Sequence, residues 1–482
     1  MPSSSEIPRP AGSLVSHSLR FVKNTMVFYE EAFRECGDIF TTRIPGLGKW
    51  VYVCSPEFAR AIFAAPPEVL AGGDIEGFSL AHLLGHGAAS HLDGAAHRER
   101  RHVTSRYLDA QAGLRHVDEI RGITERRLAG WPIGKPFRLV LELQRIALEA
   151  LISVFFGGAE AGAVPRLADL YEDFSFKALR SPASVHPILQ YDLGPWSPWG
   201  RVKRRQRDLV NAFSREIDAR MAAINAIDAI DAIDAIDARN AADATAATAA
   251  GAPAAAGARP QADDLVAGLA RARLADGSRL SREVILAEIL DLLFQGHELT
   301  GDSMTWTMAE LLSHPEVVAR LRQELDPVIG ETGVESAHLP GLPYLEAVVY
   351  EGLRRRPSNF ATTVRRVKQP FQLGAYLLPA GTLVAVCYPA VTMREDLFSH
   401  PHDFDPQRFY GTQPPPAACP FGGGPHICAG RELAIVVMKV ALATIVRRAE
   451  LKLAQEEVRP VRNAYYYEPN QGLLVTLASR RG

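Results

Sequence analysis

Several features that would assign this chain to a familiar class are missing from it. Its 482 residues contain no apolar run long enough to span a bilayer. The start, from Met1 to Ser18, is rich in proline and serine, and no continuous apolar run follows it. We therefore expect neither a secretory signal nor a membrane anchor. The formal net charge is only −2, so there is no large basic field and no reason to expect nucleic acid as a partner.

Cysteines are few, odd in number and scattered. The chain has five, and no two of them stand in a Cys-x-x-Cys spacing: Cys36, Cys54, Cys387, Cys419 and Cys428. This usage argues against a disulfide framework and against a structural zinc site, and it fits a reducing compartment. We therefore expect a cytoplasmic protein of bacterial type.

Helical periodicity dominates the chain, and strand patterns are few and peripheral. The expected helices are Pro165–Leu179, Trp199–Ala223, a segment capped by Asp263-Asp264 and running to about Arg273, Ser281 to about Leu312, one from Pro315, one from Pro343 to before Pro357, and Cys428–Ala449. Strands are expected in Asp38–Cys54, in Val364–Ala390, and as a hairpin in Tyr465–Leu477 around Pro469-Asn470. The prediction is a mainly α fold with a small β portion, in one large domain of residues 1–482.

The segment from Ala223 to Ala262 differs in kind from the rest. It repeats Ala-Ile-Asp and then runs into Ala, Thr, Gly and Pro. Because a period of three slips against the 3.6-residue turn, the isoleucines spiral around a helix and form no single buried stripe. We expect a helical extension that passes into a flexible, low-complexity insertion at about residues 223–262, without catalytic content.

The most informative stretch is residues 421–430, which read Phe-Gly-Gly-Gly-Pro-His-Ile-Cys-Ala-Gly. Consecutive glycines let the backbone fold tightly and approach a flat ligand closely. Cys428 then falls at the start of an apolar helix, where unpaired amides and the macrodipole favour a thiolate. The alternative is a glycine-rich turn before a helix, with a buried and inert cysteine.

This stretch resembles the cysteine-loop signature of the cytochrome P-450 family, Phe-x-x-Gly-x-(Arg or His)-x-Cys-x-Gly, at every defined position. The resemblance implies a heme-thiolate protein in which Cys428 is the metal ligand of heme b, iron protoporphyrin IX. It implies that Phe421 packs beside the iron–sulfur bond and that His426 faces a heme propionate. Gly424 and Gly430 would permit the loop and close helix contact, so the loop positions assigned to heme binding are Phe421, Gly422, His426, Cys428 and Gly430.

A second resemblance lies upstream, where Glu351 and Arg354 stand three apart and Arg408 follows in Phe-Asp-Pro-Gln-Arg-Phe. Alone, such a pair is common on a solvated helix surface. In this context it resembles the Glu-x-x-Arg helix of the family and the later arginine that completes a buried network. Its implied role is structural.

The segment from Asp93 to Arg101 also resembles the family segment that enters the helix over the heme, and the resemblance implies three further residues that bind the anionic propionates. His97 and Arg101 are four apart in the segment from Asp93 to Arg101, so both project from one helix face. The alternative is a basic solvated face. By the resemblance, Arg365 supplies the third contact, and it is preferred over the adjacent Arg366.

The long helix carries Gln-Gly-His-Glu-Leu-Thr at residues 295–300. In the resembled family the matching motif bends the helix beside the heme, and its acid and threonine organise water and deliver protons. Gly296 and Glu298 match that motif, but Leu299 stands where the first threonine is expected, and Thr300 is about a hundred degrees around the helix. Leu299 either lines the pocket or reroutes proton delivery, since its side chain forms no hydrogen bond. The catalytic residues implied are Gly296, Glu298, Leu299 and Thr300.

The function implied by the resemblance is hydroxylation or epoxidation of a lipophilic small molecule, with dioxygen and two electrons. No dinucleotide fingerprint or cysteine cluster indicates a fused reductase, so ferredoxin and ferredoxin reductase are the expected partners of a monomer. Arg431 and Arg355, near the cysteine loop, are candidate contacts for the redox partner that delivers the electrons. One alternative is a heme-thiolate isomerase or dehydratase without net oxygen insertion, which would need no reductant. Another is a heme-based sensor without turnover.

The substrate itself is not specified by the sequence. The resemblance places pocket walls at about Gly73–Ser90, Leu170–Pro187, the long helix, Asn359–Thr363 and the tail, with Phe78 as one candidate contact. A terpenoid, steroid, fatty acid or other secondary metabolite fits the family.

Overall fold

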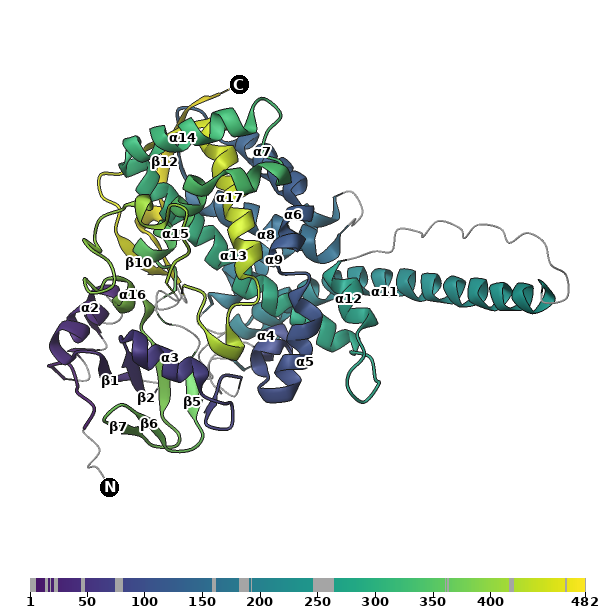
Figure 1. Cartoon of the computed structure of the whole chain (residues 1–482), viewed down its shortest axis with the longest axis horizontal. Helices are drawn as coiled ribbons and strands as arrows, with labels where there is room; N and C mark the ends of the chain where they lie inside the picture. The colour runs from purple at the N-terminus through teal and green to yellow at the C-terminus, as the bar shows by residue number, and fades with distance from the viewer. Residues whose placement is uncertain are drawn as a thin grey trace. The chain divides into compact units, whose positions relative to one another are not determined.

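The computed structural model describes residues 6–13, 16–17, 19–20, 25–44, 48–73, 81–157, 162–181, 190–191, 193–245, 264–359, 361, 364–415, 420–463 and 466–481. Helices predominate in this part of the chain, and its strands form four small sheets (Figure 1). The prediction of a mainly α fold with a minor β portion is confirmed. Phe78 lies outside the described residues.

Two compact units make up the chain. One combines Met1–Ile152 with Leu290–Gly482, and the other is Ser153–Ile289. Two helices, α8 (Leu139–Phe156) and α13 (Arg282–Ser313), contribute residues to both units. That the whole chain acts as one domain stays a prediction.

The largest sheet belongs to the first unit and has the strand order β1-β2-β8-β5-β3. Its strands are β1 (Ile39–Ile44), β2 (Gly48–Val53), β3 (Leu70–Ala71), β5 (Arg365–Val367) and β8 (Leu383–Val386). The strands β1 and β2 were predicted from the alternation in Asp38–Cys54. They pair antiparallel, whereas β2 and β8 run parallel.

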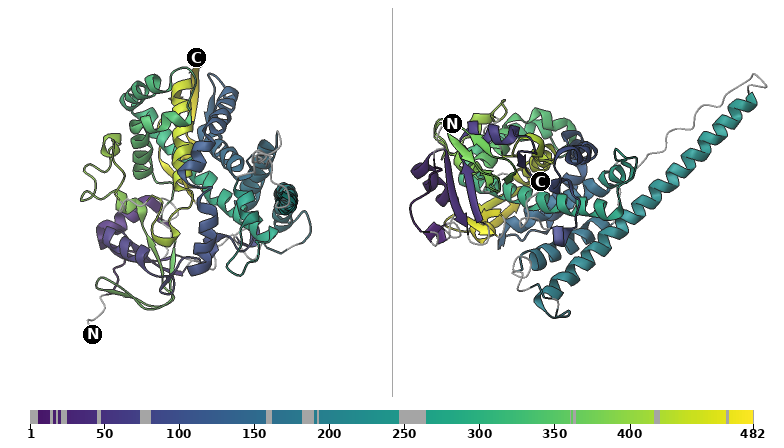
Figure 2. Two further views of the ribbon diagram at one scale, coloured as in Figure 1. Left: turned by 45° about the vertical axis from the view of Figure 1, so that its right-hand side comes forward. Right: turned by 90° about the horizontal axis from the view of Figure 1, so that it is seen from below.

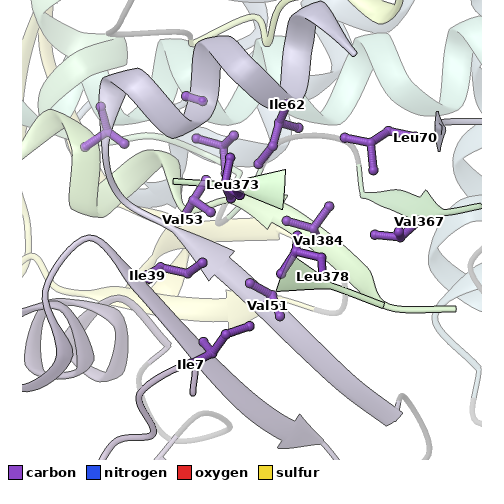
Figure 3. Packing of buried hydrophobic residues seen from close by; sticks show 13 residues of the cluster. Ile7, Ile39, Val51, Val53, Ile62, Leu70, Val367, Leu373, Leu378 and Val384 are labelled. Carbon is purple, nitrogen blue, oxygen red and sulfur yellow. The ribbon is translucent and has the colours of Figure 1, made fainter. Parts of the chain in front are cut away.

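Apolar side chains pack between this sheet and the helix α3 (Pro56–Ala64). Figure 3 shows Ile62 of α3 facing Val53, Val384 and their neighbours. The helix begins after Ser55, whose hydroxyl accepts hydrogen bonds from the amides of Glu57 and Phe58. This packing fixes the position of α3, which contacts the turn η7 (Gly424–His426) of the cysteine loop (residues 421–430).

The central helix of the first unit is α17 (Arg431–Arg448). Every residue from Leu433 to Val446 except Ala434 is buried, as expected of a helix that is apolar all round. It packs against α6 (Ala110–Arg115), α7 (Val117–Gly130), α14 (Pro315–Ile329) and α15 (Pro343–Arg355). As predicted, proline is the first residue of both α14 and α15.

The shorter elements of this unit connect and flank these helices. They are α2 (Thr25–Cys36), α4 (Ala81–Leu84), η1 (Ala89–His91), α5 (Gly94–Ser105), β4 (Pro136–Arg138), η4 (Ser336–Gly341), β6 (Phe371–Leu373), β7 (Tyr376–Leu378), α16 (Tyr388–Thr392), η5 (Pro406–Phe409), η7 (Gly424–His426), β9 (Ala449–Leu453), β10 (Pro460–Asn463), β11 (Tyr466–Pro469), η8 (Asn470–Gly472) and β12 (Leu474–Arg480).

The second unit contains α9 (Ala163–Phe174), the π-helical turn η2 (Ser175–Leu179), α11 (Pro198–Thr245) and α12 (Leu265–Arg271). Asp264 caps α12 as predicted, since its Oδ1 accepts the amide of Ala267 at 2.8 Å. The other oxygen, Oδ2, lies 2.9 Å from Arg220 of α11, which ties the two helices together.

The Ala-Ile-Asp repeat is helical throughout its length. It continues α11 without a break as far as Thr245, and Figure 2 shows this helix as one rod. The extension predicted from Ala223 onward is therefore present as helix. The part of the expected insertion from Ala246 to Ala262 lies outside the described residues.

Three of the predicted boundaries are wrong. The tail does not form a hairpin, because β11 pairs with β10 whereas β12 pairs with β4 and β9. The strand pattern predicted to reach Ala390 ends at Val386, and α16 follows it. The last helix begins at Arg431, three residues after Cys428, because Gly424–His426 first forms a separate turn.

Candidate active site

The cysteine loop is closed by its own backbone. The amide of Cys428 donates to the carbonyl of Phe421 at 2.9 Å, and the amide of Ile427 donates to the carbonyl of Gly424 at 3.1 Å. These bonds hold Cys428 at a defined place just before α17. The sulfur is presented by a rigid turn.

Glycine is required at two positions of this loop. Gly422 and Gly424 have φ values of +71° and +68°, in the left-handed region. A Cβ on Gly424 would also collide with the carbonyl oxygen of Phe63 at the end of α3. At Gly430, by contrast, a Cβ would meet none of the described residues within 4 Å, so close helix contact does not explain that glycine.

The Cys428 thiol is exposed, but protein atoms still surround it closely enough to affect its ionisation. Desolvation raises the pKa of the thiol, while the amide of Gly430 and the charges of Arg101 and Arg431 lower it without offsetting the rise. The net shift of the pKa is therefore upward, although the Gly430 amide at the N-cap of α17 acts in the predicted direction. A coordinated metal ion deprotonates a thiol outright, so the donor remains suited to iron.

Basic side chains gather near Cys428. The rings of His97, on α5, and His426, in the loop, stack with centroids 4.0 Å apart. Burial lowers the pKa of His97 to about 4, and His426 and Arg101 push it in the same direction. Arg101 thus lies near His97, as their spacing in α5 predicted, and it also lies near Cys428.

Asp93 organises this group although no motif assigned it a role. Its Oδ1 accepts a hydrogen bond from Nε2 of His426 at 2.9 Å, and its two oxygens accept the amides of Gly72 and Gly73 at 3.0 Å each. Hydrogen bonding to His426 and to these amides lowers the pKa of Asp93 against the opposing effect of desolvation. Asp93 thereby anchors the loop histidine to the segment before α5.

Arg365 lies beside this group with an unused donor. It is 4% exposed, its Nη1 is buried, and no described residue accepts a hydrogen bond from that nitrogen. Burial lowers the pKa of Arg365 to about 10, and the nearby charge of Asp93 opposes the shift. A buried guanidinium with a spare donor fits an anionic ligand group. In β5, Arg366 is only half-buried.

We refer to His97, Arg101, Arg365 and His426, together with Asp93, as the basic cradle. Its cations and the cysteine sulfur lie on segments that are distant in the sequence, and the cradle can hold two carboxylates beside a planar group bound by Cys428. The residues present therefore fit a heme group.

Substitution of Arg365 tests the cradle. Arg365→Gln should speed heme release about tenfold or more, because a hydrogen bond to a charged group contributes roughly 1.5–3 kcal/mol. Transfer of heme to an excess of apomyoglobin measures that rate. The matched control is Arg366→Gln on the same strand, which should change the rate by at most about fivefold, because a charge that remains in contact with water contributes about 1 kcal/mol or less. Equal effects of the two variants would contradict the role given to Arg365.

The Glu-x-x-Arg pair is buried and forms the predicted network. Glu351 and Arg354 are 0% and 1% exposed, and two hydrogen bonds of 2.7 Å join them. Arg408 completes the network at 3.3 Å from Oε1 of Glu351. Arg354 also donates to three backbone carbonyls between residues 392 and 403. The alternative of a solvated surface pair is wrong.

In α13, residues 295–300 form uninterrupted helix. Gly296 allows close contact with α8, because a Cβ there would lie 2.8 Å from Cδ1 of Leu151. Glu298 is buried, with its Oε1 3.7 Å from Nε2 of His297. Leu299 is half-buried, and Thr300 is buried.

Gly301 is a second structural glycine that the motif comparison missed. A Cβ on Gly301 would lie 2.5 Å from the Cα of Gln144, a backbone atom of α8. Its neighbour Asp302 accepts a hydrogen bond from Gln144 at 2.7 Å. The glycine after the Glu-Leu-Thr run was the only sequence signal for this helix contact.

A cavity of about 540 Å³ in the first unit lies away from this site. Its lining includes Glu310, Arg356 and Trp306, and none of the cradle or cysteine-loop residues. Arg356 donates to Glu310 at 2.7 Å and lies over the ring of Trp306. Because it contains neither the cysteine nor any residue of the cradle, this cavity is not the candidate active site.

Comparison with known proteins agrees with the site. The cytochrome P450 family model matches residues 8–472. Two proteins of Mycobacterium tuberculosis are similar over most of their length: cytochrome P450 138 is 31% identical over 92% of this chain and 90% of that protein, and cytochrome P450 135B1 is 28% identical over 98% and 91%.

Solved structures share the fold. A retinoic acid-bound cyanobacterial CYP120A1 has a TM-score of 0.77 and 23% identity, covering 96% of both chains. The cytochrome P450DA heme domain has a TM-score of 0.78 and 17% identity, covering 98% of both chains. At these identities the likeness concerns the fold alone.

The chain belongs to the cytochrome P450 family. Members of this family are heme-thiolate oxidoreductases that catalyse monooxygenation, and they generally use redox partners and lipophilic substrates. None of the helices that the structure describes combines the length and apolar character needed to cross a membrane.

Proposed function

We propose that this protein binds heme b and inserts one oxygen atom of dioxygen into a C–H or C=C bond of a lipophilic small molecule. The observation that carries the proposal is the exposed Cys428 sulfur beside a cradle in which Arg365 has a buried, unpartnered donor. Heme held by a thiolate supplies oxygen activation when it is bound. A secondary metabolite is the proposed substrate class.

The residues of the chain hold and orient the cofactor. Cys428 is the proposed iron ligand, with Phe421, Gly422 and Gly430 shaping its loop. His97, Arg101, Arg365 and His426 are the proposed contacts to the propionates. Burial lowers the pKa of His97 to about 4, and an adjacent propionate would raise it, because an opposite charge favours the protonated ring.

Proton delivery is assigned to α13, in which Leu299 replaces the threonine hydroxyl of the family motif. Within residues 298–300, the polar side chains of Glu298 and Thr300 hold water through hydrogen bonds. Gly296 lets α13 pack closely against α8. Leu299 excludes water at the position between them. We propose that a substrate hydroxyl or an additional water completes the route past Leu299.

Leu299→Thr tests this route. A hydroxyl at this position should raise the ratio of product formed to reductant consumed by up to about fivefold, because a hydrogen bond contributes roughly 1 kcal/mol. Product and reductant are measured together under single-substrate conditions, and Leu299→Val is the matched control without a hydroxyl. If coupling and product were both unchanged in Leu299→Thr, the rerouting idea would be wrong.

Oxygen labelling tests the function as a whole. The heme-loaded protein is supplied with NADPH, ferredoxin and ferredoxin reductase, a lipophilic compound that shifts its Soret band, and heavy-oxygen dioxygen. One labelled oxygen atom should appear in the product, and none without reductant. Turnover without reductant and without label would instead establish the isomerase or dehydratase alternative, which the leucine at 299 keeps open.

Electron transfer is proposed to involve separate proteins that dock near the cysteine loop of a cytoplasmic monomer. Of the two arginines singled out for docking, Arg431 is exposed and pairs with Glu432 at 2.8 Å. Arg355 is half-buried and donates to the carbonyl of His402 at 2.7 Å. Arg431 is therefore the better candidate.

A further inference from the structure

The middle of α13 is largely shielded from solvent, but one of its faces carries polar side chains. Of residues 290–311, all of them described, only Gln295 is exposed. Asp291, Gln295 and Leu299 are spaced by four residues, so they lie along one face of the helix. Leu299 is the residue that the proposed function places beside the reaction centre, and the same face leads from it to Asp291.

Asp291 is buried and is held by neutral groups only. It is 7% exposed, and its Oδ2 accepts hydrogen bonds from the hydroxyl of Ser90 at 2.8 Å and from Nε2 of Gln295 at 2.7 Å. The other oxygen, Oδ1, accepts no hydrogen bond from a described residue and is not among the fully buried unpartnered atoms. One oxygen is thus fixed in place, and the other is left for a ligand.

Two other buried acids of the same unit are paired with a cation. Glu149 pairs with Arg145 at 2.6 Å, and Glu310 pairs with Arg356 at 2.7 Å. Within the described chain, no basic side chain forms an ion pair with Asp291. Burial accordingly raises the pKa of Asp291 to about 6, although the hydrogen bonds from Ser90 and Gln295 lower it. A buried carboxylate without a cation is costly, and a cationic ligand would remove that cost.

Ser90 connects this carboxyl to a second wall of the site. It belongs to η1, at the end of the segment from Gly73 to Ser90 that the family resemblance gives as a pocket wall. Both partners of Oδ2 are hydrogen-bond donors. They hold the carboxyl group through this oxygen and favour its ionised form. The arrangement is that of an acceptor prepared for a donor or cation that none of the described residues supplies.

We propose that Asp291, positioned by Ser90 and Gln295, binds the cationic amine group of a lipophilic substrate. The proposal rests on the proposed oxygenase function, because it assigns the substrate class of that same site. Asp291 and Leu299 are eight residues apart, or about 12 Å along the helix. The substrate is therefore an amphiphile whose cationic group lies on the order of 10 Å from the carbon that is oxidised.

Binding of charged and uncharged probes to the heme-loaded protein tests this site. The probes are decyltrimethylammonium, which has a permanent charge and no lone pair to ligate iron, with decanol and decanoate for comparison. Calorimetry gives the dissociation constants, so no turnover is needed. Wild-type protein should bind the ammonium compound about tenfold more tightly than decanol, and decanoate most weakly.

Asp291→Asn removes the charge and keeps the shape and the hydrogen-bond acceptor. It should weaken binding of decyltrimethylammonium about tenfold or more and leave decanol within about twofold. Glu283→Gln, which neutralises an exposed acid on the same helix, should change neither. Unchanged ammonium binding in Asp291→Asn would overturn the proposal, and so would an equal loss for decanol, which would indicate recognition of a neutral donor.

The pH dependence of ammonium binding gives a second test of the Asp291 carboxyl. Between pH 8 and pH 5, wild-type affinity for the ammonium compound should fall as Asp291 takes up a proton, because its pKa is about 6. Among the described residues, His91 on η1 and His297 and Glu298 on α13 are titratable groups close in sequence to Ser90 or Asp291, and none of them contributes to that pKa. Asp291→Asn lacks the carboxyl, so a pH dependence that persisted in it would contradict the assignment.

Thermal unfolding separates a binding defect from a folding defect. A carboxyl whose pKa rises from 3.8 to about 6 on folding costs stability as the pH rises through that range, since the native state must give up its proton. Above pH 6 Asp291→Asn should therefore be at least as stable as wild type. The carbon monoxide spectrum of the same sample separates the two proposals: a normal thiolate band with unchanged ammonium binding refutes this inference alone, whereas a missing band in wild type refutes the oxygenase function.

Discussion

Replacing Cys428 by serine should abolish the red-shifted Soret band of the reduced, carbon monoxide-treated protein and reduce oxygenation to background. A serine hydroxyl is far less acidic than a thiol and does not give iron the electron density of a thiolate. Because Cys428 is exposed and held by backbone hydrogen bonds, the smaller side chain fits without disturbing the loop. Far-ultraviolet circular dichroism should therefore be unchanged.

The control for this experiment is another free cysteine. Cys36 is the last residue of α2 and is half-buried, and Cys36→Ser should keep both the band and the activity. A band that survived in Cys428→Ser would show that a different group ligates the iron. A band lost in both variants would show that the spectrum reports general damage to the protein.

The second large effect is expected at the buried network. Glu351→Gln leaves the charge of Arg354 in the interior, 1% exposed, with backbone carbonyls as its main partners. Removing one partner of a buried ion pair costs about 3–5 kcal/mol. We expect a lower urea midpoint for loss of the Soret signal and a poor yield of heme-loaded protein.

An exposed pair provides the matched comparison. Glu432→Gln breaks the pair between Arg431 and Glu432, whose side chains are both exposed, and should cost about 1 kcal/mol or less. Similar midpoints for Glu351→Gln and Glu432→Gln would mean that the network stabilises little. The comparison uses the same chemical change in both places, so the difference reports burial.

Motifs with fixed spacing were the part of the site that the sequence could predict. The pair Glu351–Arg354 is local to one helix, and its burial follows from the apolar residues around it in α15. The cap at Asp264 and the proline starts of α14 and α15 depend on neighbouring residues only. Each of these features depends on only a few neighbouring residues, and the structure contains all of them.

Features that depend on distant segments were not predictable. The tail strand β12 pairs with β4, more than three hundred residues away, although the Pro-Asn turn favoured a local hairpin. The ionisation of Cys428 depends on burial by surrounding segments, which outweighs the local helix start. Asp93 and Asp291 are carboxylates without motif signals, and only the partners His426 and Ser90 make them notable.

The contact between Asp93 and His426 also bears on how the protein assembles. It joins residues 333 positions apart, whereas Glu351 and Arg354 belong to one helix turn. Contacts of short sequence separation form early in folding, and those that close long loops form late. The helix with Glu351 is therefore expected to form before the basic cradle closes. On this order the cofactor enters a chain whose core is already built, and its arrival completes one of the late, long-range closures of the fold.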